Sequence, residues 1–169
     1  MFPHDKDRSP GFGPVDNSNS SYAGWKTMDF RSVSLREGFW AKRVTVNREV
    51  SLHYAFEMLE KSGDFDNLRI AAGLIKGNYR GYVFLDSDIY KWLEAVAWEL
   101  GREADKDLLS KADQAIALIA AAQRPDGYIN SYVQTREFPE PWIDLDNGHE
   151  LYCAGHLFQA AVAFQRALG

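Results

Sequence analysis

The reactive side chains of this sequence are concentrated in one short segment, 148–156, which reads GHELYCAGH and holds the only cysteine and two of the four histidines. On a helix at 100° per residue, His149, Cys153 and His156 fall within about 60° of one another and share one face. A His and a Cys four residues apart resemble the HExxH zinc motif with its second histidine replaced. His156 lies roughly 10 Å along the helix from His149, too far to share one ion with it. Two ligands are fewer than most zinc sites use, so we expect no metal to be bound by this segment alone.

The same side chains have simpler explanations. Cys153 is expected to be a small buried apolar residue and His156 a hydrogen-bonded histidine on the inner face of the helix. His149 differs because it follows the Asn147-Gly148 turn, where side chains emerge from a loop into a cleft. A ligand contact and a structural role are equally open for it. Glu150 is explained either as a general acid or base or by the favourable field of a helix N-terminus.

A second candidate for chemistry is the pair Asp86 and Asp88. Two carboxyl groups that flank a glycosidic bond can act as general acid and base. Two residues apart on a helix, however, these side chains point about 200° away from each other. Helix capping by Asp86 and a favourable first-turn charge at Asp88 explain the pair better than catalysis does.

Aromatic residues lie in the segments between the predicted helices. Rings in such loops serve either as sugar-stacking platforms or as anchors that hold the loop on the core. The residues concerned are Tyr79, Tyr82, Tyr128, Tyr132 and Trp142. Both interpretations are open from the sequence.

Helical elements must position these side chains. Apolar residues recur at three- and four-residue spacing, with glycines such as Gly63 and Gly101 as expected stops. The predicted helices cover residues 46–62, 66–75, 86–100, 106–122 and 149–168. The last of them is expected to bury Leu151, Ala154, Phe158, Ala161 and Val162.

The connections complete a coarse picture. Residues 128–133 are predicted to form a short strand or an extended segment, and the proline-bearing stretch 138–142 a long loop over a site. Consecutive antiparallel helices predict an all-α assembly of αα-hairpins. Such hairpins bury their faces against neighbours, so a chain of about two and a half hairpins is expected to be incomplete.

Composition narrows the class of protein. With 46% apolar and 14% aromatic residues, the chain is expected to form one globular unit. A net charge of −5 with scattered basic residues argues against nucleic acid or an anionic membrane surface as partner. A single cysteine excludes an intrachain disulfide, and no apolar leader or membrane-spanning run is present, so we expect a cytoplasmic protein.

Four motifs in order resemble the amino-terminal part of glycoside hydrolase family 127, the β-L-arabinofuranosidase family. They are NLRIAAG at 67–73, VFLDSDIYKWLEAV at 83–96, AAQ at 121–123 with DGYINSY at 126–132, and HELYCAGH at 149–156. The resemblance covers roughly residues 35–169. Residues 1–34 are expected to be an arm that is flexible up to about Tyr22 and then extended.

The resemblance implies an (α/α)6 barrel and retaining removal of non-reducing terminal β-L-arabinofuranosyl groups. In that family a zinc-bound cysteine is the nucleophile, with further cysteines and a glutamate as ligands and another glutamate as acid. Those positions lie beyond Gly169, and Cys153 does not match the nucleophile. The resemblance implies that His149 contacts the terminal sugar, and that Asp86, Asp88, Tyr128 and Trp142 shape its pocket.

Two functions follow as hypotheses. The first is the amino-terminal piece of a family-127 glycosidase, inactive alone because the catalytic part is missing; zinc would then be a cofactor of the full-length enzyme only. The second is a helical module that binds a carbohydrate or a protein without chemistry. The first also predicts an exposed apolar edge on the last helix, where the rest of the same domain would pack.

Overall fold

The computed structural model describes residues 13–136 and 140–169, and every regular element within them is helical. The predicted all-α class is therefore confirmed. The elements are η1 (Phe30–Ser32), α1 (Gly38–Val46), the π-helical turn η2 (Asn47–Ser51), α2 (Leu52–Ser62), α3 (Asp64–Ala71), α4 (Asp86–Arg102), α5 (Lys106–Ala122), α6 (Ser131–Gln134) and α7 (Glu150–Leu168). No helix in the described part of the chain is long and apolar enough to span a membrane.

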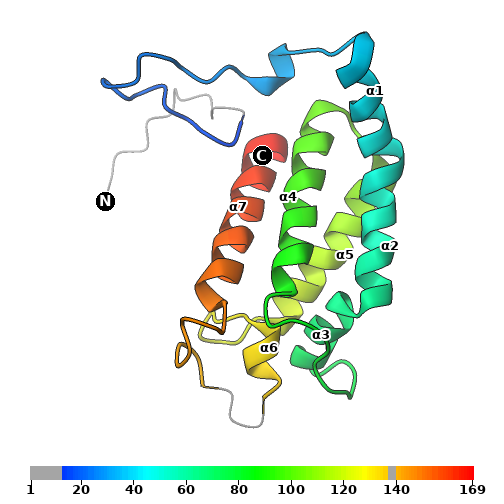
Figure 1. The fold of residues 1–169 in the computed structure, drawn as a ribbon, viewed down its shortest axis with the longest axis vertical. Coiled ribbons are helices and arrows are strands. Elements are labelled where there is room, and N and C mark those ends of the chain that lie inside the picture. Colours follow the sequence, from blue (N-terminus) through cyan, green and yellow to red (C-terminus); the bar gives the residue numbers. More distant parts are fainter. Residues whose placement is uncertain (1–12, 137–139) are drawn as a thin grey trace.

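The helices pack in two layers that run in opposite directions (Figure 1). Helices α4 and α7 lie side by side and parallel, and α4 is the main packing partner of α7. Helices α2 and α5 run the other way and pack against α4. Asp105 starts α5, because its side chain accepts hydrogen bonds from the backbone N–H of Asp107 at 2.9 Å and of Leu108 at 3.1 Å.

Helix α4 supplies the centre of the core. Ile89, Leu93 and Val96 recur at helical spacing and are 0 to 2% exposed. The indole Nε1–H of Trp92 donates a hydrogen bond of 2.8 Å to the backbone oxygen of Leu52, which ties α4 to α2. The apolar face predicted for this helix is therefore the face that is buried in the core.

The beginning of the chain differs from the prediction. Helix starts at Gly38 rather than at Val46, and continues through η2 into α2. Of the arm predicted for residues 1–34, residues 1–12 lie outside the described residues. From Gly13 onward the arm lies across the C-terminal ends of α4 and α7, where the ring of Phe30 packs edge-on against Trp98 with centroids 5.5 Å apart.

The segment 128–133 was predicted to be extended, and this is wrong for its second half. Residues Ser131–Gln134 form the short helix α6. Asn130 caps it by accepting a hydrogen bond of 2.9 Å from the backbone N–H of Val133. Of the predicted loop 138–142, residues 138 and 139 lie outside the described residues, and residues 140–149 are irregular.

Helix α7 leaves exposed the large apolar residues that were predicted to be buried, although Cys153 is buried as expected. Leu151, Phe158 and Val162 are 64%, 67% and 44% exposed, whereas Cys153 and Ala163 are buried in the contact with α4. Both faces of this helix are apolar, and periodicity does not tell which one meets the core. The predicted exposed apolar edge is therefore present, and it is formed by residues that were expected to be buried.

Candidate functional site

The N-terminal ends of α4, α6 and α7 meet at one end of the molecule, together with the irregular segments before them (Figure 1). Asp86 begins α4, Ser131 begins α6, and His149 directly precedes α7. The fold therefore brings together residues from sequence segments more than 40 residues apart. This is the end where the sequence places its candidate sugar contacts.

The carboxylate of Glu150 lies at the centre of this end and is 3% exposed. It accepts the hydrogen bond of the Tyr128 hydroxyl, and both its oxygens lie 3.0 Å from the backbone nitrogen of Trp142. The rings of Tyr128 and Trp142 also pack edge to face, with centroids 5.2 Å apart. Glu150 thus holds the loop before α7 against the segment after α5. The sequence offered only its first-turn position as a signal for this residue.

Tyr128 is a supporting residue in this arrangement. Its side chain is mostly buried at 9% exposure, and its hydroxyl group is used by Glu150. Burial, followed by the neighbouring Glu150 carboxylate, raises the pKa of Tyr128. Trp142, by contrast, is 47% exposed and presents part of its indole to solvent.

Trp142 and His149 share an uncommon backbone conformation. They are the two non-glycine residues in the described chain with positive φ, at 66° and 54°. Bulky residues adopt this left-handed region only where the surroundings impose it, and such residues cluster at functional sites. Gly148, between them, sits where a Cβ would come within 2.5 Å of the backbone oxygen of Asp144. The turn that presents His149 therefore requires glycine at this position.

One ring nitrogen of His149 already forms a hydrogen bond within the protein. Its Nδ1 lies 2.8 Å from the backbone oxygen of Asn147, and a carbonyl oxygen can only accept, so Nδ1 carries the proton. In the neutral ring Nε2 is then a hydrogen-bond acceptor. The ring packs against Phe84 at 5.2 Å and Tyr152 at 5.8 Å between centroids. This geometry suits an acceptor for a hydroxyl group.

Asp86 has a different role from the predicted cap. The residue before it, Leu85, is the N-cap of α4, whereas the Asp86 carboxylate accepts hydrogen bonds from the backbone N–H of Ser131 at 2.7 Å and from the Ser131 hydroxyl. It therefore satisfies a free donor in the first turn of α6. Asp86 is 2% exposed, and burial is the main cause that raises its pKa. In this structure the Asp86 side chain joins α4 to α6.

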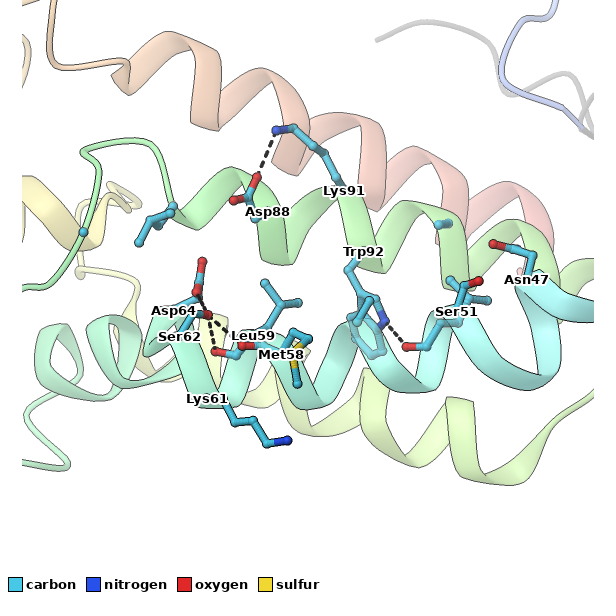
Figure 2. Close-up of a pocket in the computed structure, with 15 residues that line it drawn as sticks. Asn47, Ser51, Met58, Leu59, Lys61, Ser62, Asp64, Asp88, Lys91 and Trp92 are labelled. Atoms are coloured by element: carbon cyan, nitrogen blue, oxygen red, sulfur yellow. Dashed lines mark hydrogen bonds and ion pairs between the residues drawn. The ribbon is translucent and has the colours of Figure 1, made fainter.

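Asp88 lies apart from Asp86. It forms an ion pair of 3.1 Å with Lys91 and lines a cavity of about 850 Å³ between α2 and α4 (Figure 2). The walls of this cavity are mainly apolar and include Leu52, Leu59 and Trp92. The two aspartates therefore do not form a catalytic pair across one site.

Cys153 and His156 do not join His149 around an ion. Cys153 is 1% exposed, and burial raises the pKa of its thiol to about 12. His149 lies outside the helix as its N-cap, and its ring and that of His156 both pack against Tyr152. Across residues 13–136 and 140–169, no group of three His, Cys, Asp or Glu side chains is arranged to hold a metal. The residues present here do not fit a zinc site.

Comparison with known proteins gives a consistent result. A family profile described as the β-L-arabinofuranosidase GH127 catalytic domain matches residues 32–169. A non-reducing end β-L-arabinofuranosidase from Bifidobacterium longum subsp. longum is 38% identical over 115 residues, which are 64% of this chain and 17% of that protein.

Two solved structures are similar in fold. A GH127 β-L-arabinofuranosidase from Geobacillus stearothermophilus T6 matches with a TM-score of 0.78 and 44% identity, over 81% of this chain and 23% of that one. A second GH127 β-arabinofuranosidase matches with a TM-score of 0.76 and 32% identity, over 83% of this chain and 24% of that one. The chain thus spans less than a quarter of the length of each of these relatives.

Proposed function

This chain belongs to glycoside hydrolase family 127, the β-L-arabinofuranosidase family, and from this membership we propose that it forms one sugar-binding part of a longer enzyme. That enzyme removes non-reducing terminal β-L-arabinofuranosyl groups with retention of configuration. Within it, the present chain contributes the end where α4, α6 and α7 begin. The proposal is supported by the names of relatives that are 32 to 44% identical to this chain.

The presentation of His149 is the observation that carries the proposal. Its backbone is held at a φ of 54°, and its Nδ1 is committed to the backbone oxygen of Asn147. Nε2 remains to accept a hydrogen bond from a hydroxyl group of the terminal sugar. Glu150 holds the neighbouring Trp142 in place, and the half-exposed indole offers an apolar face to the sugar ring.

The bond-breaking residues belong to the rest of the longer protein. Cys153 is unsuited to act as nucleophile, because its thiol is buried and its raised pKa leaves little thiolate at neutral pH. The nucleophile, the zinc ligands and the general acid implied by the family are therefore proposed to lie outside this chain. The residues described here bind and orient the sugar.

The rest of the domain is also proposed to cover two apolar surfaces. One is the exposed face of α7 with Leu151, Phe158 and Val162, and the other is the cavity between α2 and α4 (Figure 2). Both surfaces border α4, because Phe158 and Val162 line a hollow together with Trp98 of α4, and Lys91 and Trp92 of α4 line the cavity. Helices packed on these surfaces would continue the arrangement into a closed ring.

The test compares the longer protein with the 169-residue chain on an aryl β-L-arabinofuranoside. We expect the longer protein to release L-arabinose, first as the β anomer, and the chain alone to show no turnover. Turnover by the chain alone would place catalysis among its own residues. A longer protein that binds the sugar without hydrolysing it would instead support the non-catalytic carbohydrate-binding module.

A further inference from the structure

Tyr82 is an exposed aromatic residue next to the candidate sugar site. Its side chain is 72% exposed, although a tyrosine that merely anchors a loop is expected to be mostly buried. One face of its ring lies parallel to Phe84, with an interplanar angle of 1° and centroids 5.4 Å apart. The ring is therefore supported on one side and open on the other.

The backbone that carries Tyr82 is held by several hydrogen bonds. The Tyr79 hydroxyl donates to the backbone oxygen of Tyr82 at 2.5 Å, and the backbone N–H of Leu85 donates to the same oxygen at 3.2 Å. Two residues earlier, at Arg80, the backbone N–H and oxygen form hydrogen bonds of 3.0 and 2.9 Å with the side-chain amide of Asn67. A ligand that packs on the ring would thus find it already positioned, with little entropy lost on binding.

Phe84 links Tyr82 to His149. The Phe84 ring stacks on Tyr82 at 5.4 Å and packs against the His149 ring at 5.2 Å. Tyr82 is therefore one ring farther out than the residue assigned to the terminal sugar. A second sugar, attached to the first, would reach a platform at this separation.

We propose that Tyr82 is the stacking platform for the sugar unit to which the terminal arabinofuranosyl group is attached. This inference rests on the proposed function, because it takes His149 as the contact of the terminal sugar. The C–H groups on one side of a sugar ring pack on an aromatic face, and the tyrosine hydroxyl is not needed for that contact. Tyr82 thereby favours substrates in which the leaving group is a sugar.

The experiment measures kcat and KM of the longer protein on two substrates, a β-L-arabinofuranosyl disaccharide and methyl β-L-arabinofuranoside. In Tyr82→Ala we expect KM for the disaccharide to rise about three- to tenfold, with KM for the methyl glycoside unchanged. Tyr82→Phe retains the ring and should behave like the unsubstituted protein on both. Tyr54→Ala is the matched control, because Tyr54 is exposed on α2 at 59%.

Each outcome decides one question. Equal effects of Tyr82→Ala on both substrates, or no effect on either, would overturn the platform. A loss of thermal stability in Tyr82→Ala without a selective change in KM would show that the rest of the longer protein covers this ring, and would overturn it too. If the unsubstituted protein neither binds nor hydrolyses either glycoside, the proposed function is wrong, and the inference fails with it.

Discussion

The hydroxyl group of Tyr128 donates a hydrogen bond to the carboxylate of Glu150, which lies 22 residues later in the chain. Both side chains are buried, and the same carboxylate accepts the backbone N–H of Trp142. This contact joins the segment that follows α5 to the first turn of α7. Through Trp142, it also fixes the path of the segment that precedes His149.

The first prediction concerns the Tyr128 and Glu150 pair. Glu150→Gln and Tyr128→Phe should each lower the free energy of unfolding by about 1 to 3 kcal/mol, since each leaves a buried partner less well satisfied. The double variant should lose at least about 1 kcal/mol less than the sum of the two single effects. Urea denaturation measures all three.

Tyr54→Phe provides the control for that cycle. Tyr54 is exposed on α2, so its change should stay within about 0.5 kcal/mol. Strictly additive effects of the Tyr128 and Glu150 substitutions would contradict an energetic link between the two residues.

The second prediction is a pH dependence that arises from Asp86. Because burial raises its pKa in the native state, the native state keeps this proton at pH values where the unfolded chain has released it. The stability that Asp86 contributes is therefore complete below the ordinary carboxyl pKa of 3.8 and decreases as pH rises through the raised value. The difference in unfolding free energy between the unsubstituted protein and Asp86→Asn should decrease over that range.

Denaturation at a series of pH values tests this sign. Asp88→Asn is the neighbouring control, since Asp88 is half-exposed and its ion pair with Lys91 is expected to contribute no more than about 1 kcal/mol. A difference for Asp86→Asn that grows with rising pH would show that the carboxylate is stabilised by its surroundings, contrary to this account.

The third prediction concerns Cys153. Its buried thiol, with a pKa near 12, should react with iodoacetamide at pH 8 far more slowly in the native chain than in the unfolded chain. Cys153→Ala should retain kcat in the longer protein within about twofold and lower stability by about 1 kcal/mol. Loss of activity in a variant with unchanged thermal stability would give Cys153 a chemical role that this account denies.

The fourth prediction follows from the exposed face of α7. The 169-residue chain should bind a fluorescent apolar dye, and Phe158→Lys should reduce that binding, because Phe158 is 67% exposed. In the longer protein the same substitution should destabilise the fold by about 2 kcal/mol or more, since the residue is proposed to be buried there. Ala117→Lys on the exposed side of α5 is the control.

Local patterns in the sequence predicted much of the fold. Helix α5 begins at the predicted Lys106, α4 begins within two residues of its predicted start, and Gly63 ends α2 with a φ of 94°. The orientation of α7 was not predictable in the same way, because Leu151 and Phe158 on one face are as apolar as Cys153 and Ala160 on the other. Only the packing against α4 decides between these faces.

The sequence predicted the position of a site residue only where neighbouring residues in the chain determine that position. The position of His149 after the Asn147-Gly148 turn is a local feature, and the structure places it at the loop-to-helix junction as expected. The partners of Asp86 and Glu150 lie 45 and 22 residues away, so no spacing rule connects them. The capping role predicted for Asp86 is therefore wrong, because Leu85 is the N-cap of α4 and Asp86 binds Ser131 instead. The hydrogen bonds of Glu150 to Tyr128 and Trp142 were not predicted.

The central claim is that His149 contacts the terminal sugar, and His149→Asn in the longer protein tests it most directly. Asparagine tolerates the left-handed backbone at this position, so the fold and the thermal stability should be retained. We predict that kcat/KM for an aryl β-L-arabinofuranoside falls at least about tenfold, while His53→Asn on α2 leaves it unchanged. An unchanged kcat/KM in a folded His149→Asn variant would contradict the account.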